Sequence, residues 1–248
     1  MLLPNWEQLP KELQTSEGKP YYDILRKKQG SLFFKRLFDI LVSCLMLILL
    51  SPLCLILGIL IKCDSKGPIL FRQVRVTQFG KQFRIFKFRT MVPEASNLGA
   101  QVTMRGDTRV TRIGKTLRRF RLDELPQLLN VLCGQMSFVG VRPEVPRFVE
   151  CYTGEMRATL LLPAGITSPA SIAFREEDAL LAGADDPDKA YRVEILPKKM
   201  DLNLCYLREF GFFHDIAILF ETVTSVFGRG REKDAGETSG VGGHPGSK

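Results

Sequence analysis

The stretch ILVSCLMLILLSPLCLILGILI, residues 40–61, contains no charged side chain. As a straight helix it would reach roughly 33 Å, enough to cross a hydrocarbon core of about 30 Å. Ser51 and Pro52 lie at its midpoint, and a proline inside a helix removes one backbone hydrogen bond. The residues alone leave two interpretations open: one kinked membrane span, or two short helices that enter and leave the membrane by the same face. Basic residues flank both ends, so the positive-inside rule does not choose a direction of insertion.

The composition of the whole chain limits its class. Its 248 residues are 45% hydrophobic and 25% charged, which excludes both a disordered chain and a membrane protein with many spans. The formal net charge of +8 favours anionic partners such as nucleic acid, phospholipid headgroups or phosphorylated substrates. Only His214 and His244 are histidines. A histidine-centred triad or a multi-histidine zinc site is therefore nearly excluded.

The remaining sequence predicts a mixed but mostly helical domain. Residues 69–77 and 81–90 alternate between apolar and polar side chains around Phe79-Gly80, which predicts a β-hairpin. Helices are expected over residues 111–119, 123–133, 144–152, 188–210 and 212–227. From residue 228 onward glycine is frequent, which is typical of a disordered tail.

The positive charge is concentrated in residues 84–121, where ten basic side chains are opposed only by Glu94 and Asp107. Three explanations compete. The segment is a solvated basic face near anionic headgroups, a nucleic-acid-binding surface, or a phosphate site. No nucleic-acid-binding module is recognisable in the sequence, so nucleic acid is the weakest of the three.

An acidic pair follows this basic segment directly, in RRFRLDELPQLLN, residues 118–130. Asp123 fits the N-cap of a helix, and Glu124 falls in its first turn, where carboxylates are favoured. Taken alone, the segment is best interpreted as a capped amphipathic helix. Two carboxylates among arginines also suit phosphoryl chemistry, in which a divalent cation bridges carboxylate and phosphate and a carboxylate attacks phosphorus. Arg142 lies further on, either in a surface turn or as another phosphate ligand.

These pieces together resemble the bacterial sugar transferases, that is, the monotopic phosphoglycosyl transferases, over about residues 31–170. The resemblance is carried by KRLFDI (35–40), GPILFRQVRV (67–76), FRIFKFRTM (83–91), RLDELPQLLNVLCGQMSFVGVRPE (121–144) and AGIT (164–167). Two stretches depart from the family pattern: Val141 stands where the family usually has proline, and Ser168-Pro169 follows the AGIT block where the family often has glycine.

The resemblance implies a reaction and its residues. Asp123 would attack the β-phosphate of a UDP-sugar, release UMP and hold the sugar phosphate covalently, until polyprenyl (undecaprenyl) phosphate accepts it. Glu124 would assist, and Asp123 and Glu124 would be the Mg²⁺ ligands. Lys87, Arg118 and Arg142 correspond to substrate- and phosphate-binding residues. The product would be the first membrane intermediate of a glycan such as exopolysaccharide, O-antigen, capsule or glycoprotein.

The resemblance also implies an architecture. The expected fold class is α+β and mostly helical, with a re-entrant helix-break-helix at Ser51 and Pro52, a cytosolic domain of amphipathic helices and a small β-hairpin. The expected segments are an N-terminal cytosolic segment (1–30), the membrane hairpin (31–66), a catalytic domain (67–227) and a disordered tail (228–248). The length suggests the minimal catalytic form. The chain is expected at the bacterial inner membrane, with its site on the cytosolic face, and with phospholipid but no nucleic acid as a further partner.

A non-catalytic membrane adaptor on the same fold is the alternative. Such an adaptor would bind lipid or protein without releasing UMP, and its binding would not depend on the Asp123 carboxylate.

Overall fold

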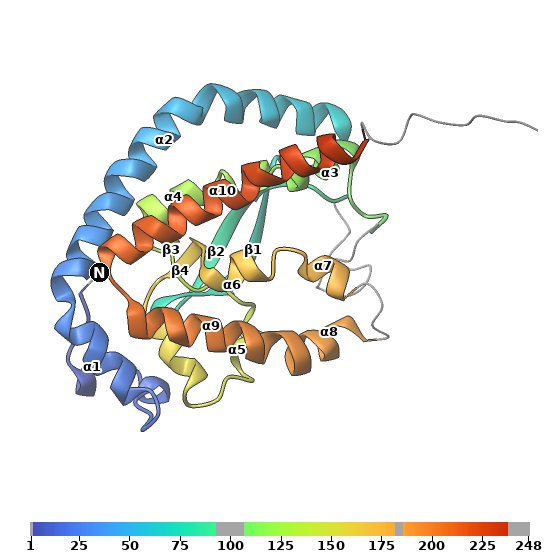
Figure 1. Cartoon of the computed structure of the whole chain (residues 1–248). Coiled ribbons are helices and arrows are strands. Elements are labelled where there is room, and N and C mark those ends of the chain that lie inside the picture. Colours follow the sequence, from blue (N-terminus) through green and yellow to red (C-terminus); the bar gives the residue numbers. More distant parts are fainter. Residues whose placement is uncertain (1, 93–106, 182–185, 238–248) are drawn as a thin grey trace, which may run out of the picture.

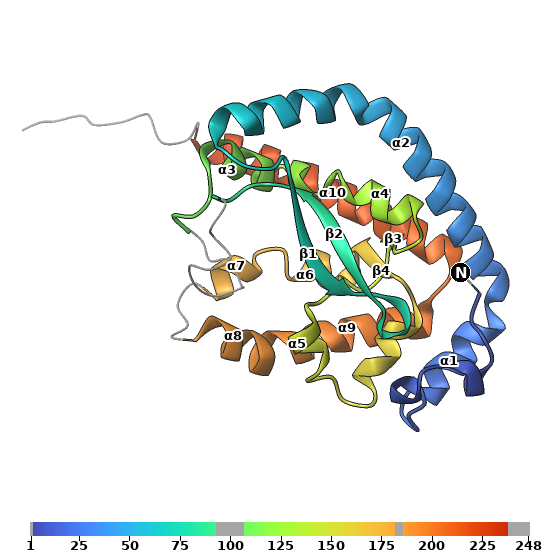
Figure 2. The ribbon, with the colours of Figure 1, turned by 180° about the vertical axis from the view of Figure 1, so that it is seen from behind.

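The computed structural model describes residues 2–92, 107–181 and 186–237. A long helix, α2 (Gln29–Asp64), arches over one side of a domain built from shorter helices and two pairs of strands (Figure 1). The strand pair β1 (Leu70–Val76) and β2 (Gln82–Phe88) lies near the middle of the domain when it is seen from behind (Figure 2). The mostly helical α+β class with a small hairpin is thereby confirmed.

β1 and β2 form the predicted antiparallel hairpin, with Leu70 opposite Phe88 and Val76 opposite Gln82. Its turn uses two residues with positive φ, Phe79 at 59° and Gly80 at 73°. Positive φ is favourable for glycine and uncommon for phenylalanine. Phe83 and Ile85 of β2 are buried in the main apolar cluster, so one face of the hairpin is fixed against the core. Phe88 is buried in a separate cluster with residues of α2 and α3.

A second strand pair was not predicted. β3 (Met136–Val139) and β4 (Ala164–Thr167) run parallel, with Met136 opposite Ala164 and Val139 opposite Thr167. Every β3 side chain is buried, so the apolar–polar alternation that identifies a half-exposed strand is absent. The strand pair ends in a close contact between two glycines, Gly140 and Gly165.

Gly165→Ala is expected to destabilise the fold, because an added Cβ would lie 2.2 Å from the Gly140 nitrogen. Overpacking in a tight interior costs about 1–3 kcal/mol. Chemical unfolding in detergent should show a lower midpoint for Gly165→Ala than for Gly30→Ala, where no atom lies within 4 Å of the added Cβ. Equal midpoints for the two variants would refute the close contact.

The other helices and turns surround the strands, and the two main apolar clusters lie between them. The α-helices are α1 (Lys19–Lys27), α3 (Arg112–Arg119), α4 (Gln127–Leu132), α5 (Pro146–Val149), α6 (Pro169–Ala173), α7 (Glu177–Leu180), α8 (Pro187–Ala190), α9 (Leu196–Glu209) and α10 (Phe212–Glu237). The 3-10 turns are η1 (Trp6–Gln8), η2 (Lys11–Leu13), η3 (Gln78–Gly80), η5 (Leu122–Glu124) and η6 (Met156–Leu161), and η7 (Tyr191–Ile195) is a π-helical turn.

The first half of α2 is bound to the domain through the charged residues of the KRLFDI block. Lys35 is buried, donates to the Val139 carbonyl at 2.6 Å and pairs with Asp215 of α10. Asp39 accepts hydrogen bonds from the Ser137 hydroxyl and the Phe138 amide, both at 3.1 Å. These contacts join α2 to β3.

The second half of α2 is bound to the same domain. Leu57 and Ile61 pack with Phe88 and Leu117 in an apolar cluster. Arg89 donates through Nη2 to the Ser65 carbonyl at 2.6 Å, at the end of the helix. Both ends of α2 are therefore attached to one folded unit.

The expected helix-break-helix needs correction, because α2 continues as a helix through Ser51 and Pro52. Proline removes the hydrogen bond that its own nitrogen would donate to the Ile48 carbonyl. The Ser51 hydroxyl donates to that carbonyl at 2.8 Å, which replaces the missing partner. The helix curves over the domain instead of breaking (Figure 1).

Two other sequence expectations change. The helix expected over residues 144–152 is only the single turn α5, Pro146–Val149. α10 begins at Phe212 as expected but runs to Glu237, so the boundary at residue 228 falls inside a helix. Residues 238–248 lie outside the described residues.

Candidate active site

Three separate elements bring the predicted site residues together. Lys87 lies on β2, Asp123 and Glu124 lie in the turn η5, and Arg142 follows β3. The turn is entered through Arg121, whose backbone is left-handed with φ of 56°. This conformation separates the end of α3 from η5, so the acidic pair faces β2 and the loop after β3.

Glu124 is held by three cations. Its Oε1 accepts from Arg142 Nη2 at 2.6 Å and from Lys87 Nζ at 2.9 Å, and Arg121 Nη1 lies 3.8 Å away. Burial alone would raise the pKa of Glu124, but the charges of Arg142 and Lys87 hold it well below the ordinary range. Glu124 is therefore a carboxylate whose negative charge is balanced by fixed positive groups.

Asp123 differs from Glu124 because it is buried without such partners. Its Oδ1 has no hydrogen-bond partner among the described residues. Burial raises the pKa of Asp123; the charge of Lys87 opposes the increase, and the charge of Glu124 adds to it. An oxygen that accepts no hydrogen bond keeps its lone pairs available for a metal ion or for attack on an electrophile.

The capping interpretation of Asp123 is wrong. α4 begins at Gln127 with Pro126 in the capping position, and its N-terminus has no side-chain cap. Asp123 instead lies inside η5, one turn before the helix. Capping requires an oxygen that accepts from the helix's own amides, and the unpartnered Oδ1 of Asp123 does not.

Arg118 belongs to the same neighbourhood without touching the carboxylates. It lies in the last turn of α3, and its Nε donates to the Thr90 hydroxyl at 2.9 Å. Its charge lowers the pKa of Asp123, although less than burial raises it. The carbonyl of Thr90 also packs closely against α3. A Cβ added to Gly114 of α3 would lie 2.1 Å from the Thr90 carbonyl oxygen.

Sequence reasoning missed Arg121 and Arg75 as members of the site. Arg121 was one of many arginines in the basic segment, and only its ion pair with Glu124 distinguishes it. Arg75 of β1 donates to the Pro143 carbonyl at 3.1 Å and so holds the loop that carries Arg142. The alternation of β1 places Arg72 and Arg75 on opposite faces, but it does not indicate that Arg75 reaches the loop that carries Arg142.

The two departures from the family pattern have local roles. Val141 is buried, and its carbonyl accepts from the Gly165 amide at 2.9 Å. Ser168 caps α6 by accepting from the Ser171 amide at 3.0 Å. Val141 thus acts through its backbone carbonyl and Ser168 through its hydroxyl.

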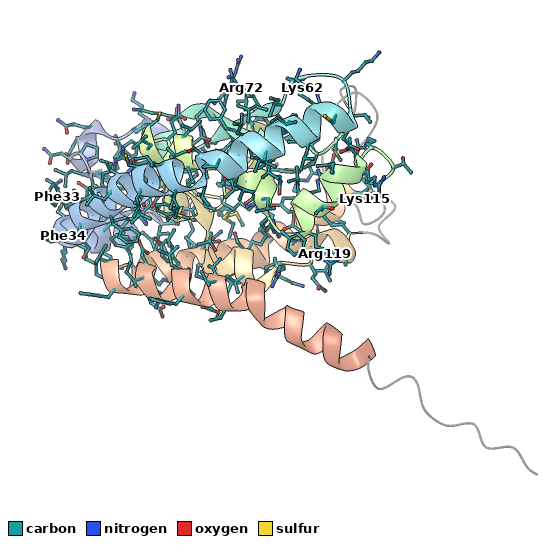
Figure 3. All side chains as sticks on the ribbon, turned by 90° about the horizontal axis from the view of Figure 1, so that it is seen from above. Phe33, Phe34, Lys62, Arg72, Lys115 and Arg119 are labelled. Carbon is teal, nitrogen blue, oxygen red and sulfur yellow. The ribbon has the colours of Figure 1, made fainter. Side chains whose placement is uncertain are left out.

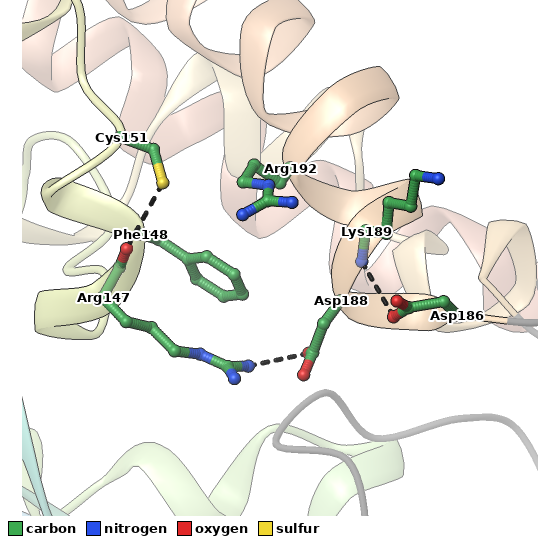
Figure 4. A pocket seen from close by; sticks show the side chains of 7 residues that line it. All are labelled: Arg147, Phe148, Cys151, Asp186, Asp188, Lys189 and Arg192. Carbon is green, nitrogen blue, oxygen red and sulfur yellow. Dashed lines mark hydrogen bonds and ion pairs between the residues drawn. The ribbon is translucent and has the colours of Figure 1, made fainter.

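A cavity of about 250 Å³ lies elsewhere, between α5 and the start of α8 (Figure 4). It is lined by Arg147, Phe148, Cys151, Asp186, Asp188, Lys189 and Arg192. Arg147 pairs with Asp188 across it at 2.7 Å. Neither Asp123 nor Glu124 lines this cavity, so its size does not mark the site of the acidic pair.

The described residues contain no group of three or more histidine, cysteine, aspartate or glutamate side chains that could hold a metal ion. A divalent ion at the acidic pair would therefore take its remaining ligands from phosphate oxygens and water. Mg²⁺ is commonly bound in this way, by one or two carboxylates together with substrate phosphates. The free Oδ1 of Asp123 fits that arrangement.

Comparison with known proteins gives a consistent result. The profile of the family described as "Bacterial sugar transferase" matches residues 30–229. The chain is 37% identical to a UDP-N-acetylgalactosamine-undecaprenyl-phosphate N-acetylgalactosaminephosphotransferase of Aeromonas hydrophila, over 86% of this chain and 50% of that protein. It is 41% identical to a UDP-glucose:undecaprenyl-phosphate glucose-1-phosphate transferase of Klebsiella pneumoniae, over 79% of this chain and 41% of that protein.

The chain thus spans about half, or less, of the length of these two relatives. It is also 37% identical to an exopolysaccharide production protein of Rhizobium leguminosarum bv. phaseoli, over 81% of this chain and 98% of that protein. The matched region includes every residue of the candidate site. The chain belongs to the bacterial sugar transferase family.

Proposed function

We propose that the protein transfers a sugar 1-phosphate from a UDP-sugar to polyprenyl phosphate, with release of UMP. The observation that carries this proposal is the contrast within the acidic pair. Asp123 is buried with a free oxygen, whereas Glu124 beside it is held by Lys87 and Arg142. Relatives named as undecaprenyl-phosphate sugar phosphotransferases support the same reaction.

The reaction proceeds in two displacements at one phosphorus atom. An oxygen of the Asp123 carboxylate forms a bond to the β-phosphorus of the UDP-sugar, and the bond from that phosphorus to the UMP oxygen breaks. A phosphate oxygen of the polyprenyl phosphate then bonds to the same phosphorus, and the acyl phosphate bond to Asp123 breaks. Partial desolvation of Asp123 makes its carboxylate a stronger nucleophile than one in water.

The surrounding cations stabilise charge on the transferring phosphoryl group. Lys87 and Arg142 lie at the carboxylate pair, and Arg118 is near enough to lower the pKa of Asp123. Fixed positive groups in a site with little water stabilise phosphoryl oxygens more than mobile counterions do. We assign phosphate binding to these three residues.

The acidic pair would also hold Mg²⁺, through Oδ1 of Asp123 and a carboxylate oxygen of Glu124. Lys87 and Arg142 would hold Glu124 in place through Oε1. When bound, the ion supplies further neutralisation of the diphosphate.

A membrane location is supported by the outer face of α2, a helix long and apolar enough to cross a membrane. This face exposes many large apolar side chains. They are those of Phe33, Phe34, Leu37, Ile40, Leu41, Leu45, Ile48, Leu49, Leu55, Ile56, Ile59 and Leu60. Such an extended apolar surface is typical of contact with lipid. Seen from above, Phe33 and Phe34 lie toward one end of α2, and the basic residues Lys62, Arg72, Lys115 and Arg119 gather around the other (Figure 3).

We propose that α2 dips into the membrane and that both of its ends lie on the same side of the membrane. Both ends are attached to the same domain. The active site would then lie at headgroup depth on the cytosolic face of the bacterial inner membrane. A soluble nucleotide and a lipid phosphate could meet there. Basic residues beside the helix would attract anionic phospholipid.

The topology predicts a labelling result. In a background without the six native cysteines, Lys27→Cys and Pro68→Cys should react with an impermeant thiol reagent from the same side of the membrane. Leu49→Cys, at an exposed apolar position on α2, should be protected by lipid. Labelling of positions 27 and 68 from opposite sides would rule out the re-entrant arrangement.

The proposed reaction is tested by UMP release from a panel of UDP-sugars, with undecaprenyl phosphate and Mg²⁺. We expect release with at least one sugar and no release when undecaprenyl phosphate and protein are both omitted. Lipid binding without UMP release from any sugar would instead favour the non-catalytic adaptor.

A further inference from the structure

Gln127, in the first turn of α4, is buried although its polar atoms bond to nothing in the described part of the chain. The residue is 1% exposed, and neither Nε2 nor Oε1 has a hydrogen-bond partner among the residues that the structure describes. A buried amide that makes no hydrogen bond costs free energy, and most buried side-chain polar atoms in folded proteins have a partner. The two bare atoms of Gln127 therefore point to a ligand as their partner.

The next amide on the same face of α4 is fully bonded. Asn130 lies one turn after Gln127, and residues three apart in a helix share a face. Asn130 Oδ1 accepts from the Phe86 amide at 2.9 Å. Its Nδ2 donates to the Arg84 carbonyl at 3.0 Å and to Gln135 Oε1 at 2.7 Å. Asn130 thus attaches α4 to β2, and Gln127 takes no part in that attachment.

Gln127 also lies beside the acidic pair. The two residues between η5 and α4 keep helical backbone angles, with φ of −52° and −63°, so Asp123 and Glu124 precede Gln127 on one helical path. Residues three and four apart on such a path are neighbours. Lys87 of β2 donates to Glu124 at 2.9 Å, and Asn130 bonds to β2 on the other side of Gln127. The Gln127 amide is thus enclosed between α4 and β2, next to the proposed nucleophile.

An amide suits some ligand groups better than others. Nε2 only donates and Oε1 only accepts, so a partner that both accepts and donates satisfies both atoms. A phosphoryl oxygen only accepts and a metal ion would bind only Oε1, so either of them would leave one buried atom without a partner. A sugar hydroxyl or an acetamido group both accepts and donates. In a UDP-sugar, the substituent at C2 is attached next to the carbon that bears the diphosphate.

We propose that Gln127 binds the sugar of the donor, with Nε2 donating to the C2 substituent and Oε1 accepting from it. This inference rests on the proposed phosphoglycosyl transfer, in which the β-phosphorus of the donor lies at Asp123. The contact holds the sugar against α4 and β2 while its phosphate is transferred. Gln127 exchanges no proton and forms no covalent bond, so its role is binding.

Gln127→Met distinguishes this role from a structural one, because it removes both polar atoms and keeps an unbranched side chain of similar size. Replacing an unpartnered buried amide by an apolar group should leave the melting temperature unchanged or raise it. The kcat/KM for UMP release from the most active UDP-sugar should fall about tenfold or more, as expected when two neutral hydrogen bonds are lost. Competitive inhibition by UDP, which carries no sugar, should not change.

The 2-deoxy analogue of the same UDP-sugar locates the contact. For the wild type it should be a poorer donor than the parent compound. Gln127→Met should lower the kcat/KM of the analogue much less than that of the parent, because the contact is already missing from the analogue. Gln82→Met, at an exposed position of β2, is the matched control and should resemble the wild type with both donors.

Several results would overturn the inference: activity of Gln127→Met equal to that of Gln82→Met, equal losses for the two donors, or weaker inhibition by UDP. The wild type supplies a test that does not depend on the folding of any variant, because equal kcat/KM for the parent donor and its 2-deoxy analogue also overturns the inference. A wild-type protein that releases no UMP from any UDP-sugar contradicts the proposed function itself, which distinguishes the two failures.

Discussion

Asp123→Asn should lower UMP release by at least about a thousandfold, as expected when the nucleophile of a covalent mechanism is removed. Asparagine has nearly the same size and shape as aspartate but cannot supply the attacking carboxylate. Because Oδ1 has no hydrogen-bond partner among the described residues, the substitution breaks no bond that holds the fold. UMP release is measured with the best UDP-sugar, undecaprenyl phosphate and Mg²⁺.

Membrane association and melting temperature of Asp123→Asn should match those of the wild type. Asp201→Asn is the matched control, because Asp201 is exposed on α9, and it should retain full activity. Normal turnover by Asp123→Asn would show that another group attacks the phosphorus.

Lys35→Met should cause the largest loss of stability. Lys35 and Asp215 form an ion pair with side chains only 3% and 5% exposed. Removing one partner of a buried ion pair leaves the other charge uncompensated and costs about 3–5 kcal/mol. The substitution also removes the donor to the Val139 carbonyl, so α2 loses a contact with β3. The midpoint of chemical unfolding in detergent measures the effect.

Two variants serve as controls for Lys35→Met. One replaces an exposed lysine of the same helix, and the other removes the charge from both members of the ion pair. Lys62→Met, at an exposed position of α2, should change the midpoint little. Lys35→Met/Asp215→Asn should recover part of the loss, since no unpaired charge remains. A midpoint for Lys35→Met equal to that for Lys62→Met would mean that the pair does not stabilise the folded protein.

The sequence was sufficient to predict the hairpin of β1 and β2, because its alternation and the Phe79-Gly80 turn are local signals. It could not predict the pairing of β3 with β4, since β3 is buried throughout, both segments have only four residues, and they lie far apart in the chain. The residues alone left the course of α2 through Pro52 open, and the resemblance favoured a break that α2 does not have. The Ser51 hydroxyl bond that compensates for the proline depends on a side-chain rotamer, which a residue pattern does not fix.

The sequence predicted that Lys87, Asp123, Glu124 and Arg142 belong to one site, but it did not predict Arg75, Arg121 or the difference between the two carboxylates. Asp123 and Glu124 are adjacent in sequence and were first interpreted together, either as a cap or as a pair. Their difference arises from distant segments, because Lys87 and Arg142 converge on Glu124 and leave Asp123 Oδ1 free.

The most direct test of the central claim is the mass of the intact protein after incubation with UDP-sugar and Mg²⁺ in the absence of undecaprenyl phosphate. We expect an increase by one sugar phosphate, located on Asp123 by peptide mapping, absent from Asp123→Asn and lost when undecaprenyl phosphate is added. UMP release with undecaprenyl phosphate but without any such adduct, or an adduct on another residue, would contradict covalent transfer through Asp123.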